Sequence, residues 1–299
     1  MNIMSRWFKN WKLIINDILV GIGFFWLFVE LISYFFSTTS DQIKNGSFFC
    51  YLLGASVTYG IFKNYPKSFF ISRIRNKDVK IGIKIGDAFE ENGSLIVPIN
   101  DHFDVSLGGN VLKAKSIQCK LIDDYYFSNE EHLKNDICNK IDLQKIPYSS
   151  GTVVEIEQNK RKFYLLVNSK RNENNRPSST IDDFMMALNG MWDYLAMDAA
   201  RDENIIIPLI NTQHGRNSSL TRDTVVKQII DTFIDASKHS TICEKLIICI
   251  HPSDIEKGQL DLDALNAYLM FKCENYKDIQ FNPKVEGTEV SSSEIKVPV

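Results

Sequence analysis

A short polar loop between two apolar segments has the residue types that could bind an anion. The segment IIIPLI, residues 205–210, predicts a buried strand, and TVVKQII, residues 224–230, has the spacing of a helix. The loop between them contains small hydrogen-bonding side chains, one glycine and one arginine. These residues are Asn211, Thr212, Gln213, His214, Gly215 and Arg216.

This composition is suited to phosphate. A helix N-terminus offers unpaired backbone N–H groups and a partial positive charge. Gly215 lets the backbone approach a ligand closely, and Arg216 can bind a phosphate through two parallel hydrogen bonds. The loop is not a Walker A motif, because it contains no lysine. The alternative is a solvated loop with glycine at a turn.

Two other strand ends carry groups that could contact the same ligand. Asn100 and Asp104 follow the apolar run SLIVPI, and the pair Gly108–Gly109 comes before the next predicted helix. Two glycine-containing loops could hold a diphosphate from both sides. Asp87 follows an earlier predicted strand, where its carboxylate can accept a hydrogen bond from an exocyclic amine such as that of adenine.

The elements around these loops predict an α/β fold. Apolar or alternating strand patterns take turns with amphipathic helix patterns, which indicates a mixed, mostly parallel sheet with helices on both faces. In such folds, ligands bind at the carboxyl ends of the strands. Strands are predicted within 79–89, 94–100, 151–170, 205–210 and 244–250, and helices within 116–126, 132–141, 180–202, 224–234 and 263–276.

The first 65 residues differ from the rest in being strongly apolar. Two runs, about 16–36 and 46–62, are long enough for transmembrane helices, with only Glu30 charged between Ile18 and Phe36. They predict a hairpin with both ends on one side of a membrane. The predicted division of the chain is 1–65 membrane hairpin, 66–77 basic linker, 78–282 ligand-binding domain and 283–299 disordered tail.

Basic residues flank the hairpin and set its orientation. Lysine and arginine precede the first run and follow the second, whereas the connecting loop has only Lys44. The positive-inside rule therefore places both termini and the ligand-binding domain in the cytoplasm. Glu30 either faces the interior of a helix assembly or reaches the outer interface, and GxxxG spacing is absent. A signal peptide and a buried helical hairpin of a soluble protein are the alternatives.

Composition excludes several other functions. The chain has 299 residues and a net charge of -3, which does not favour nucleic acid as a partner. Its six cysteines form no CxxC pair, and no metalloprotease-type histidine spacing occurs. We therefore expect no metal, no cofactor and no disulfide framework.

The motifs IGDAFE, PINDHFD with its downstream glycine pair, GTVVEI and PLINTQHGR, taken in this order, resemble a macro domain. With the two N-terminal spans, the chain is similar over its whole length to the transmembrane–macro domain type of ThsA, the effector family of the Thoeris antiphage system. This resemblance implies a macro-domain-like three-layer sandwich preceded by a two-helix transmembrane hairpin.

The resemblance also implies a role for each matching position. Asp87 matches the aspartate that contacts adenine, and Asn100 matches the asparagine near the distal ribose. Gly108 and Gly109 match the first phosphate loop, and the segment 211–216 matches the second. Ordinary macro domains have more glycine in both loops. Gln213 and His214 stand where small residues are usual, which favours a modified ADP-ribose.

By resemblance, the ligand is an ADP-ribose derivative carrying histidine, made by a partner TIR-domain protein. The implied output is oligomerisation and damage to the cell's own inner membrane, without catalysis. A membrane-tethered ADP-ribosyl hydrolase is the first alternative, with His102, Asp104 and His214 as candidates for a general base. A non-catalytic membrane scaffold is the second.

Overall fold

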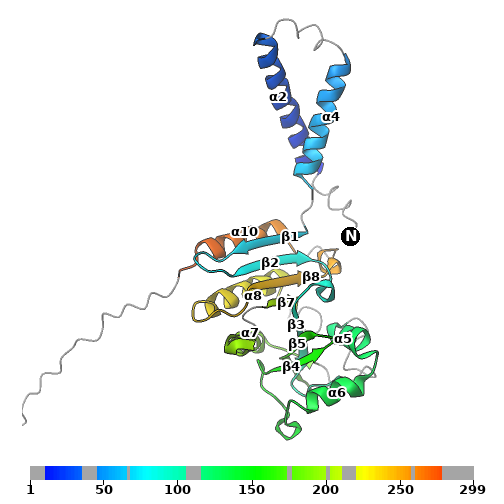
Figure 1. Cartoon of the computed structure of the whole chain (residues 1–299), viewed down its shortest axis with the longest axis vertical. Coiled ribbons are helices and arrows are strands. Elements are labelled where there is room, and N and C mark those ends of the chain that lie inside the picture. Colours follow the sequence, from blue (N-terminus) through cyan, green and yellow to red (C-terminus); the bar gives the residue numbers. More distant parts are fainter. Residues whose placement is uncertain are drawn as a thin grey trace, which may run out of the picture.

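A computed structural model describes most of the chain, and its first part is a helical hairpin (Figure 1). The hairpin consists of α2 (Trp11–Phe35) and α4 (Gly46–Lys63), which pack against each other. Most of their large apolar side chains are exposed. The described residues are 11–35, 46–65, 68–105, 116–173, 177–199, 203–210, 220–256 and 260–277.

Among the described residues, only α2 is long and apolar enough to cross a membrane. The corresponding part of α4, Phe48–Lys63, is shorter. At about 1.5 Å per residue it covers roughly 24 Å, less than the ~30 Å of a hydrocarbon core. Of the two expected spans, the described residues therefore support one clear candidate, α2, and the second, α4, is a shorter apolar helix packed beside it.

Small residues bring the two helices close together. A Cβ atom on Gly60 would lie 2.5 Å from Ile18 Cγ1, and one on Gly21 would lie 3.3 Å from Tyr59 Cδ1. Ser56 is fully buried, four residues before Gly60. The sequence has no GxxxG motif, but Ser56 and Gly60 place two small residues at that same spacing in the interface.

Polar groups join the helices where α4 ends. Asp17 Oδ1 accepts a hydrogen bond from Lys63 Nζ at 2.7 Å, and Asp17 Oδ2 accepts one from Asn64 Nδ2 at 2.8 Å. Glu30, in contrast, is exposed and has no ion-pair partner among the described residues. The hairpin alone therefore leaves this carboxylate uncovered.

The second part of the chain is built on one mixed sheet. The strand order is β1-β2-β8-β7-β3-β5-β4, and β6 pairs with β5 beside this path. The strands β2, β8, β7, β3 and β5 run parallel, while β1 and β4 are antiparallel to their neighbours. Their bounds are β1 Phe69–Arg73, β2 Lys80–Ile85, β3 Ser94–Asn100, β4 Val153–Gln158, β5 Arg161–Arg171, β6 Pro177–Ser178, β7 Asn204–Pro208 and β8 Lys245–Ile250.

The five parallel strands all end at one edge of the sheet, here called the carboxyl edge, and begin at the opposite amino edge. The connection from β2 to β3 is short, residues 86–93, although β8 and β7 lie between these strands. It therefore crosses one face of the sheet, and its 3-10 turn η2 (Ala88–Glu90) contacts β7. This crossover leaves Asp87 at the carboxyl edge.

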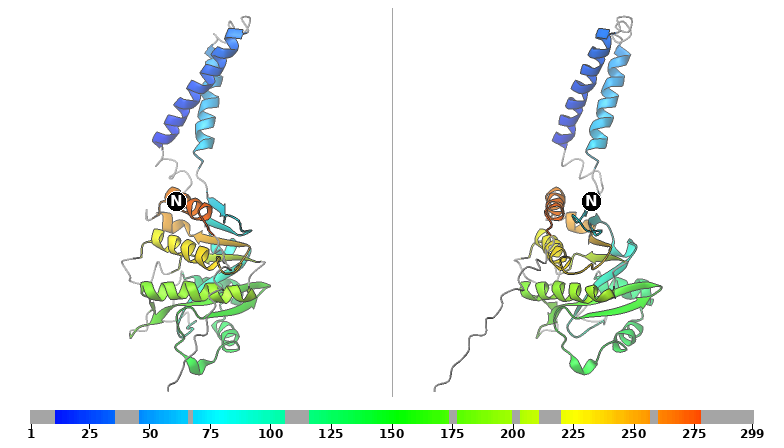
Figure 2. Two further views of the ribbon diagram at one scale, coloured as in Figure 1. Left: turned by 90° about the vertical axis from the view of Figure 1, so that its left-hand side faces the viewer. Right: turned by 60° about the vertical axis from the view of Figure 1, so that its left-hand side comes forward.

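Helices cover both faces of the sheet, as the sequence predicts for an α/β sandwich. Figures 1 and 2 show α7, α8 and α10 on one side and α5 and α6 on the other. Each group joins its own buried apolar cluster. The bounds are α5 Ile117–Tyr126, α6 Glu130–Cys138, η3 Leu143–Lys145, α7 Ile181–Tyr194, the π-helical η4 Leu195–Ala199, α8 Arg222–Ala236, α9 Pro252–Glu256 and α10 Leu262–Glu274.

The amphipathic pattern of α7 correctly predicts its buried face. Phe184, Leu188 and Trp192 are almost fully buried, and Trp192 Nε1 donates to Thr232 Oγ1 on α8 at 2.9 Å. The helix begins at a capping box formed by Thr180 with Asp183, which satisfies backbone N–H groups at the start of the helix.

The structure differs from the predicted division at residues 66–77. That range contains β1, which pairs with β2 along its whole length, so it is the first strand of the sheet and not a separate linker. The alternating segment FFISR is only five residues long and comes soon after an apolar helix, so its strand pattern is difficult to recognise in the sequence. The predicted tail, 283–299, lies outside the described residues.

Candidate ligand-binding site

The strand order brings predicted ligand residues to the carboxyl edge. Asp87 follows β2 and Asn100 ends β3, with β8 and β7 between them. Three strand spacings of about 4.8 Å place these two residues roughly 14 Å apart along the edge. The predicted phosphate loop, 211–216, follows β7 and so starts between them. This layout fits an elongated ligand with its phosphates in the middle.

Asp87 is already engaged at both carboxylate oxygens. Oδ1 accepts a hydrogen bond from Phe89 N–H at 3.0 Å and thereby caps η2. Oδ2 pairs with Lys120 Nζ from α5. A carboxylate has about four acceptor positions, so Asp87 can still accept an amine. Lys120 lies over the Phe89 ring, 5.2 Å from its centroid.

The surroundings of Asp87 keep it ionised. Burial alone raises the pKa of Asp87, but hydrogen bonds from Lys120 and from Phe89 N–H outweigh that effect. The positive charge of Lys120 and the nearby His251 act in the same direction, and the pKa lies below its ordinary value of 3.8. The site therefore offers a carboxylate, and not a carboxylic acid, to a ligand at neutral pH.

Asn100 organises the loop after β3. Its Oδ1 accepts hydrogen bonds from the backbone N–H groups of His102 at 3.1 Å and Asp104 at 3.0 Å. Its Nδ2 donates to Asp104 Oδ2 at 2.9 Å. Asn100 is buried, and the register with β5 shifts beside it, as at a β-bulge. This asparagine therefore holds Asp104 in place, whatever it also does for a ligand.

Arg171 connects this loop to the end of β5. Its Nη1 lies 3.4 Å from Asp104 Oδ2, and its backbone N–H donates to Asp101 Oδ1 at 2.9 Å. One arginine thus meets two carboxylates at the end of β5. The sequence analysis missed Arg171, because nothing local marks a charged residue at the end of a β-hairpin strand as part of a distant loop.

Asp101 and His102 form an oriented pair beside Asn100. Asp101 Oδ1 lies 2.7 Å from His102 Nδ1, and the two side chains are 8% and 31% exposed. A buried carboxylate that accepts from Nδ1–H fixes the tautomer and leaves Nε2 as the basic nitrogen. The sequence analysis weighed His102 as a base but not its partner Asp101.

A buried ion pair lies where α8 begins. Arg222 Nη2 and Nε lie 3.0 and 3.1 Å from Asp254 Oδ1, and both side chains are almost fully buried. Arg222 is the first residue of α8, and Asp254 lies in α9 after β8. This pair ties the start of α8 to the end of β8, on either side of the predicted phosphate loop.

The predicted phosphate-binding residues all lie outside the part of the chain that the structure describes. Gly108, Gly109 and the six residues Asn211 to Arg216 lie outside the described residues, so their contacts stay predictions. Of the eleven predicted ligand residues, the structure places Asp87, Asn100 and Asp104, and all three lie at the carboxyl edge.

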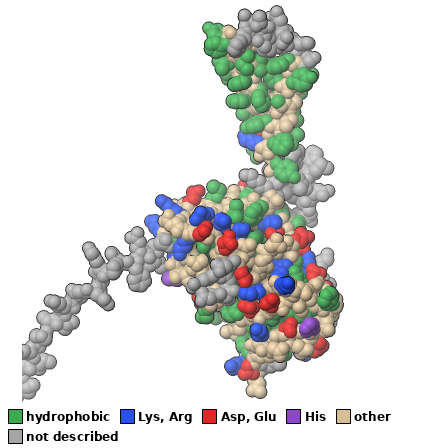
Figure 3. Space-filling model, viewed as in Figure 1, with side chains coloured by type: hydrophobic (Ala, Val, Ile, Leu, Met, Phe, Trp, Pro, Cys, Tyr) green, Lys and Arg blue, Asp and Glu red, His purple; other side chains and the backbone are tan. Residues whose placement is uncertain are grey.

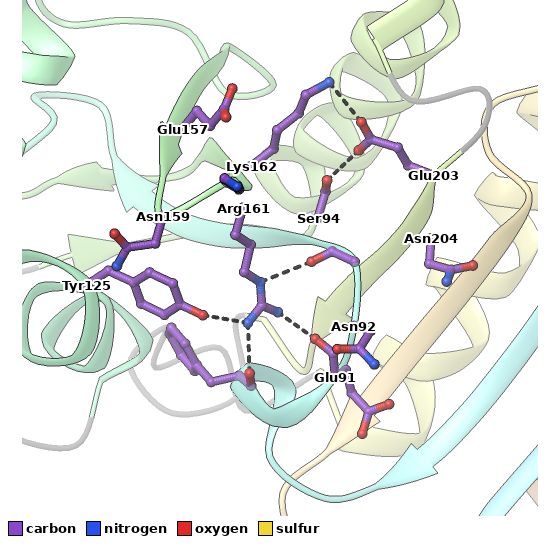
Figure 4. Close-up of a pocket in the computed structure, with 13 residues that line it drawn as sticks. Glu91, Asn92, Ser94, Tyr125, Glu157, Asn159, Arg161, Lys162, Glu203 and Asn204 are labelled. Atoms are coloured by element: carbon purple, nitrogen blue, oxygen red, sulfur yellow. Dashed lines mark hydrogen bonds and ion pairs between the residues drawn. The ribbon is translucent and has the colours of Figure 1, made fainter.

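A cleft of about 720 Å³ opens at the amino edge, away from the predicted site (Figure 4). It is lined by the crossover after η2, the β4–β5 turn and the start of β7. Lys162 Nζ pairs with Glu203 Oε1 at 2.8 Å, and Ser94 donates to the same carboxylate. The charged groups of this cleft therefore largely satisfy one another.

Arg161, at the centre of Figure 4, is a structural residue. Its five N–H groups all bind protein oxygens, four of them backbone carbonyls, so it fastens the crossover 86–93 to β5. The acceptors are the carbonyls of Gly93, Phe89, Ala88 and Glu91 and the hydroxyl of Tyr125, at 2.7 to 3.2 Å. No donor of Arg161 remains for an anion.

Metal binding has no support in the described part of the chain. No group of three or more His, Cys, Asp or Glu residues there could hold a metal ion. Several cysteines, such as Cys243 and Cys249, are buried among apolar residues, where burial raises the pKa of each thiol to about 12. These cysteines are core residues.

The family model of the macro domain of the Thoeris protein ThsA matches residues 81–251, which is more than half of the chain. The chain belongs to this ThsA macro domain family. The match begins in β2 and ends directly after β8, so it includes every strand end that forms the carboxyl edge. No curated protein matches the chain.

Several solved structures are similar to this ThsA macro domain chain at low sequence identity. The Oceanobacillus iheyensis macrodomain with MES bound is 14% identical, with 68% of this chain and 99% of that chain covered and a TM-score of 0.46. The same macrodomain with ADP is 12% identical, with 70% and 97% covered and a TM-score of 0.45. Tomato leucine aminopeptidase is 13% identical, with 68% and 38% covered and a TM-score of 0.41.

Proposed function

We propose that this chain is a membrane-anchored antiphage effector whose macro domain senses a signal derived from ADP-ribose. The observation that carries this proposal is the layout of the carboxyl edge. Asp87 and Asn100 stand three strand spacings apart along this edge, and the loop after β7 starts between them. Adenine at Asp87, the diphosphate at the loop and the distal ribose near Asn100 would fit this order.

The signal in this proposal is histidine-ADP-ribose, made by a partner TIR-domain protein. Its support is the family match together with the predicted loop, where Gln213 and His214 replace small residues. The rim beyond Asn100 has charges of both signs, since Arg171 lies beside Asp104. An amino-acid group with an amine and a carboxylate could bind there.

The output of the proposal is assembly in the membrane. The macro domain and both termini lie on the cytoplasmic side of the inner membrane, with the hairpin embedded. Ligand binding favours one arrangement of the domains, and a homo-oligomer then clusters the hairpins and disrupts the bilayer. A ligand shifts such an equilibrium only by binding one arrangement more tightly than the other.

The test is a titration of the full chain in lipid nanodiscs with ADP-ribose, histidine-ADP-ribose and ADP. A ligand at one hundred times its Kd adds about 2.7 kcal/mol to the unfolding free energy. We expect the largest shift in Tm with histidine-ADP-ribose and a smaller one with ADP, which lacks the distal ribose. If no ADP-ribose derivative raises Tm, the sensor proposal is wrong.

One observation favours a second function, hydrolysis of an ADP-ribose conjugate. His102 is oriented by the buried carboxylate of Asp101, and it directly follows the strand end that carries Asn100. Its Nε2 could act as a general base toward water. Chromatography after incubation of the chain with histidine-ADP-ribose separates the two functions, because a sensor returns the conjugate intact and a hydrolase releases ADP-ribose.

A further inference from the structure

Among the described residues, no helix covers one face of β1 and β2, the strands that follow the hairpin. The residues of β1 and β2 alternate between two faces, and Phe70, Ile81 and Ile83 point into the core under α8 and α10. The core cluster under α5 and α6 has no described member between Phe69 and Ile85. The described residues therefore leave the opposite face of β1 and β2 open.

The antiparallel register defines the composition of this open face. Phe69 lies opposite Lys84, Ile71 opposite Gly82 and Arg73 opposite Lys80. We call these six residues the β1–β2 outer face. Two members are apolar, three are cationic and none is acidic.

The apolar members are held in exposed positions. Phe69 is 40% exposed and Ile71 is 46% exposed. A Cβ atom on Gly82 would lie 2.8 Å from Phe69 Cε2, so the glycine makes room for this ring to lie flat on β2. Two exposed apolar side chains on neighbouring positions of an edge strand are unusual unless something covers them.

Two of the three cationic members, Arg73 and Lys80, are at most loosely paired within the described part of the chain. Arg73 Nη2 lies 3.3 Å from Asp78 Oδ1, with side chains 63% and 83% exposed, and Lys80 has no ion-pair partner among the described residues. The third, Lys84, is held by Glu91, whose side chain is 11% exposed, at 2.5 Å. An exposed pair such as Arg73–Asp78 contributes little to stability, so Arg73 can bind another anion instead.

The chain itself places this face close to the membrane of the proposed function. Six residue steps separate the end of α4 at Lys63 from the start of β1 at Phe69. Even fully extended, they reach only about 20 Å. The segment from Lys63 to Lys77 contains five lysines or arginines and no acidic residue. Figure 3 shows basic and hydrophobic side chains, with acidic ones among them, at the end of the domain nearest the hairpin.

We infer that the β1–β2 outer face docks on anionic phospholipid headgroups of the membrane that holds the hairpin. Phe69 and Ile71 enter the interfacial layer, while Arg73 and Lys80 bind headgroup phosphates. Docking fixes how the sheet stands on the bilayer, and with it the direction in which the carboxyl edge faces. This inference rests on the proposed membrane anchoring.

The experiment uses the full chain in vesicles, with one cysteine-linked fluorophore and a nitroxide-labelled headgroup lipid as quencher. The reporter is Ile71→Cys, in a chain with Cys50→Ser and Cys138→Ala, since the other four cysteines are buried. The matched control is Phe127→Cys, an apolar position that is 84% exposed at the end of α5. A third chain keeps Cys50 in α4 as a reporter of hairpin insertion.

On vesicles rich in phosphatidylglycerol, we expect the fluorophore at position 71 to lose more than half of its intensity and the one at 127 to keep it. Quenching at 71 should fall on vesicles of phosphatidylcholine alone. It should also fall when Arg73→Glu and Lys80→Glu are added. Unchanged quenching after both changes would contradict the headgroup role.

Two other results would overturn the inference, and they are distinguishable from failure of the proposed anchoring. If position 50 is quenched and position 71 is not, the hairpin is inserted but the face is not docked. If neither is quenched, the anchoring fails as well. If the fluorophore at 71 is shielded from aqueous iodide without lipid, a second copy or the tail after residue 277 covers the face instead.

Discussion

At the scale of single residues, the polar groups of the carboxyl edge are already bound to one another. Asn100 binds Asp104 and the backbone of its own loop, and Asp87 binds Lys120. A ligand therefore meets a rim that is pre-ordered, and it must share or replace existing hydrogen bonds. Changes at these residues should act on the shape of the loop as well as on the ligand.

Asn100→Asp should damage the loop after β3. It removes the Nδ2 donor that binds Asp104 and places a second carboxylate 2.9 Å from the first. Loss of a buried hydrogen bond together with like-charge repulsion costs about 1–3 kcal/mol of unfolding free energy. We expect a lower Tm and a Kd for histidine-ADP-ribose raised about tenfold or more, measured by calorimetry.

The control for this change is Asn159→Asp, the same chemical substitution at an exposed position of the β4–β5 turn. For Asn159→Asp, both the Tm and the Kd for histidine-ADP-ribose should stay near those of the unchanged chain. Equal Kd values for all three chains would remove Asn100 from the binding site.

Asp87 should make stability depend on pH in the acid range. Its folded pKa lies below the ordinary value of 3.8, so it stabilises the fold at any pH above that value. The contribution is lost as the pH falls through the lower, folded pKa. Asp87→Asn should therefore lower the unfolding free energy at pH 6, and the gap to the unchanged chain should narrow below pH ~4.

Urea unfolding at several pH values measures this difference in unfolding free energy between Asp87→Asn and the unchanged chain. A matched change, Asp124→Asn, alters an exposed carboxylate of α5 that has no ion-pair partner among the described residues and should leave the pH profile unchanged. A gap for Asp87→Asn that stays constant down to acid pH would mean that the Lys120 contact does not depend on the charge of Asp87.

At the scale of elements, close helix packing makes the hairpin sensitive to glycine. Gly60→Val should separate α2 from α4, because even a Cβ would lie 2.5 Å from Ile18 Cγ1 and 3.3 Å from the Ile14 carbonyl. Gly54→Val is the matched control, since nothing lies within 4 Å of a Cβ there. Overpacking of this kind typically costs about 1–3 kcal/mol.

Pulsed electron resonance in bilayers can measure this separation, with spin labels at the exposed positions Leu19 and Phe62. We expect a longer and broader distance distribution for Gly60→Val and an unchanged one for Gly54→Val. Identical distributions for the two variants would show that the helices do not pack through Gly60.

Helices and strands with a clear periodic pattern of apolar residues could be predicted from the sequence. The apolar stripe of α7, the buried runs of β7 and β8 and the β4–β5 hairpin all have patterns that depend only on nearby residues. Asp87 and Asn100 could also be placed at the carboxyl edge, because Asp87 lies two residues past the predicted strand β2 and Asn100 ends the predicted strand β3.

Contacts between distant segments could not be predicted in this way. Lys120 pairs with Asp87 because α5 docks over the crossover, and Arg171 reaches Asp104 because β5 lies next to β3. Neither contact leaves a local pattern. The strand β1 was missed for a different reason, since five residues directly after an apolar helix and within a basic segment do not show a clear alternation.

At the scale of the whole molecule, the sheet links the hairpin to the proposed ligand site. β1 is the first strand after the hairpin and pairs with β2, and Asp87 lies two residues past the end of β2. Only one strand pair therefore separates the hairpin segment from one end of the proposed site. In the proposed function, a ligand at the carboxyl edge could act on the hairpin through this strand pair.

Glu30 should matter for the output and not for the sensing. It is exposed on α2, five residues before the helix ends at Phe35, so it lies about 7.5 Å inside that end. A carboxylate in that position is costly in lipid, and clustering of hairpins would move it into a protein or water environment. The charge of Glu30 would thus favour assembly of the hairpins.

Glu30→Gln should lower the rate of ligand-triggered dye release from vesicles, while the Kd for histidine-ADP-ribose stays unchanged. Glu274→Gln, on the exposed side of α10, should alter neither. An unaltered leak for Glu30→Gln would place the carboxylate at the outer interface and separate it from assembly.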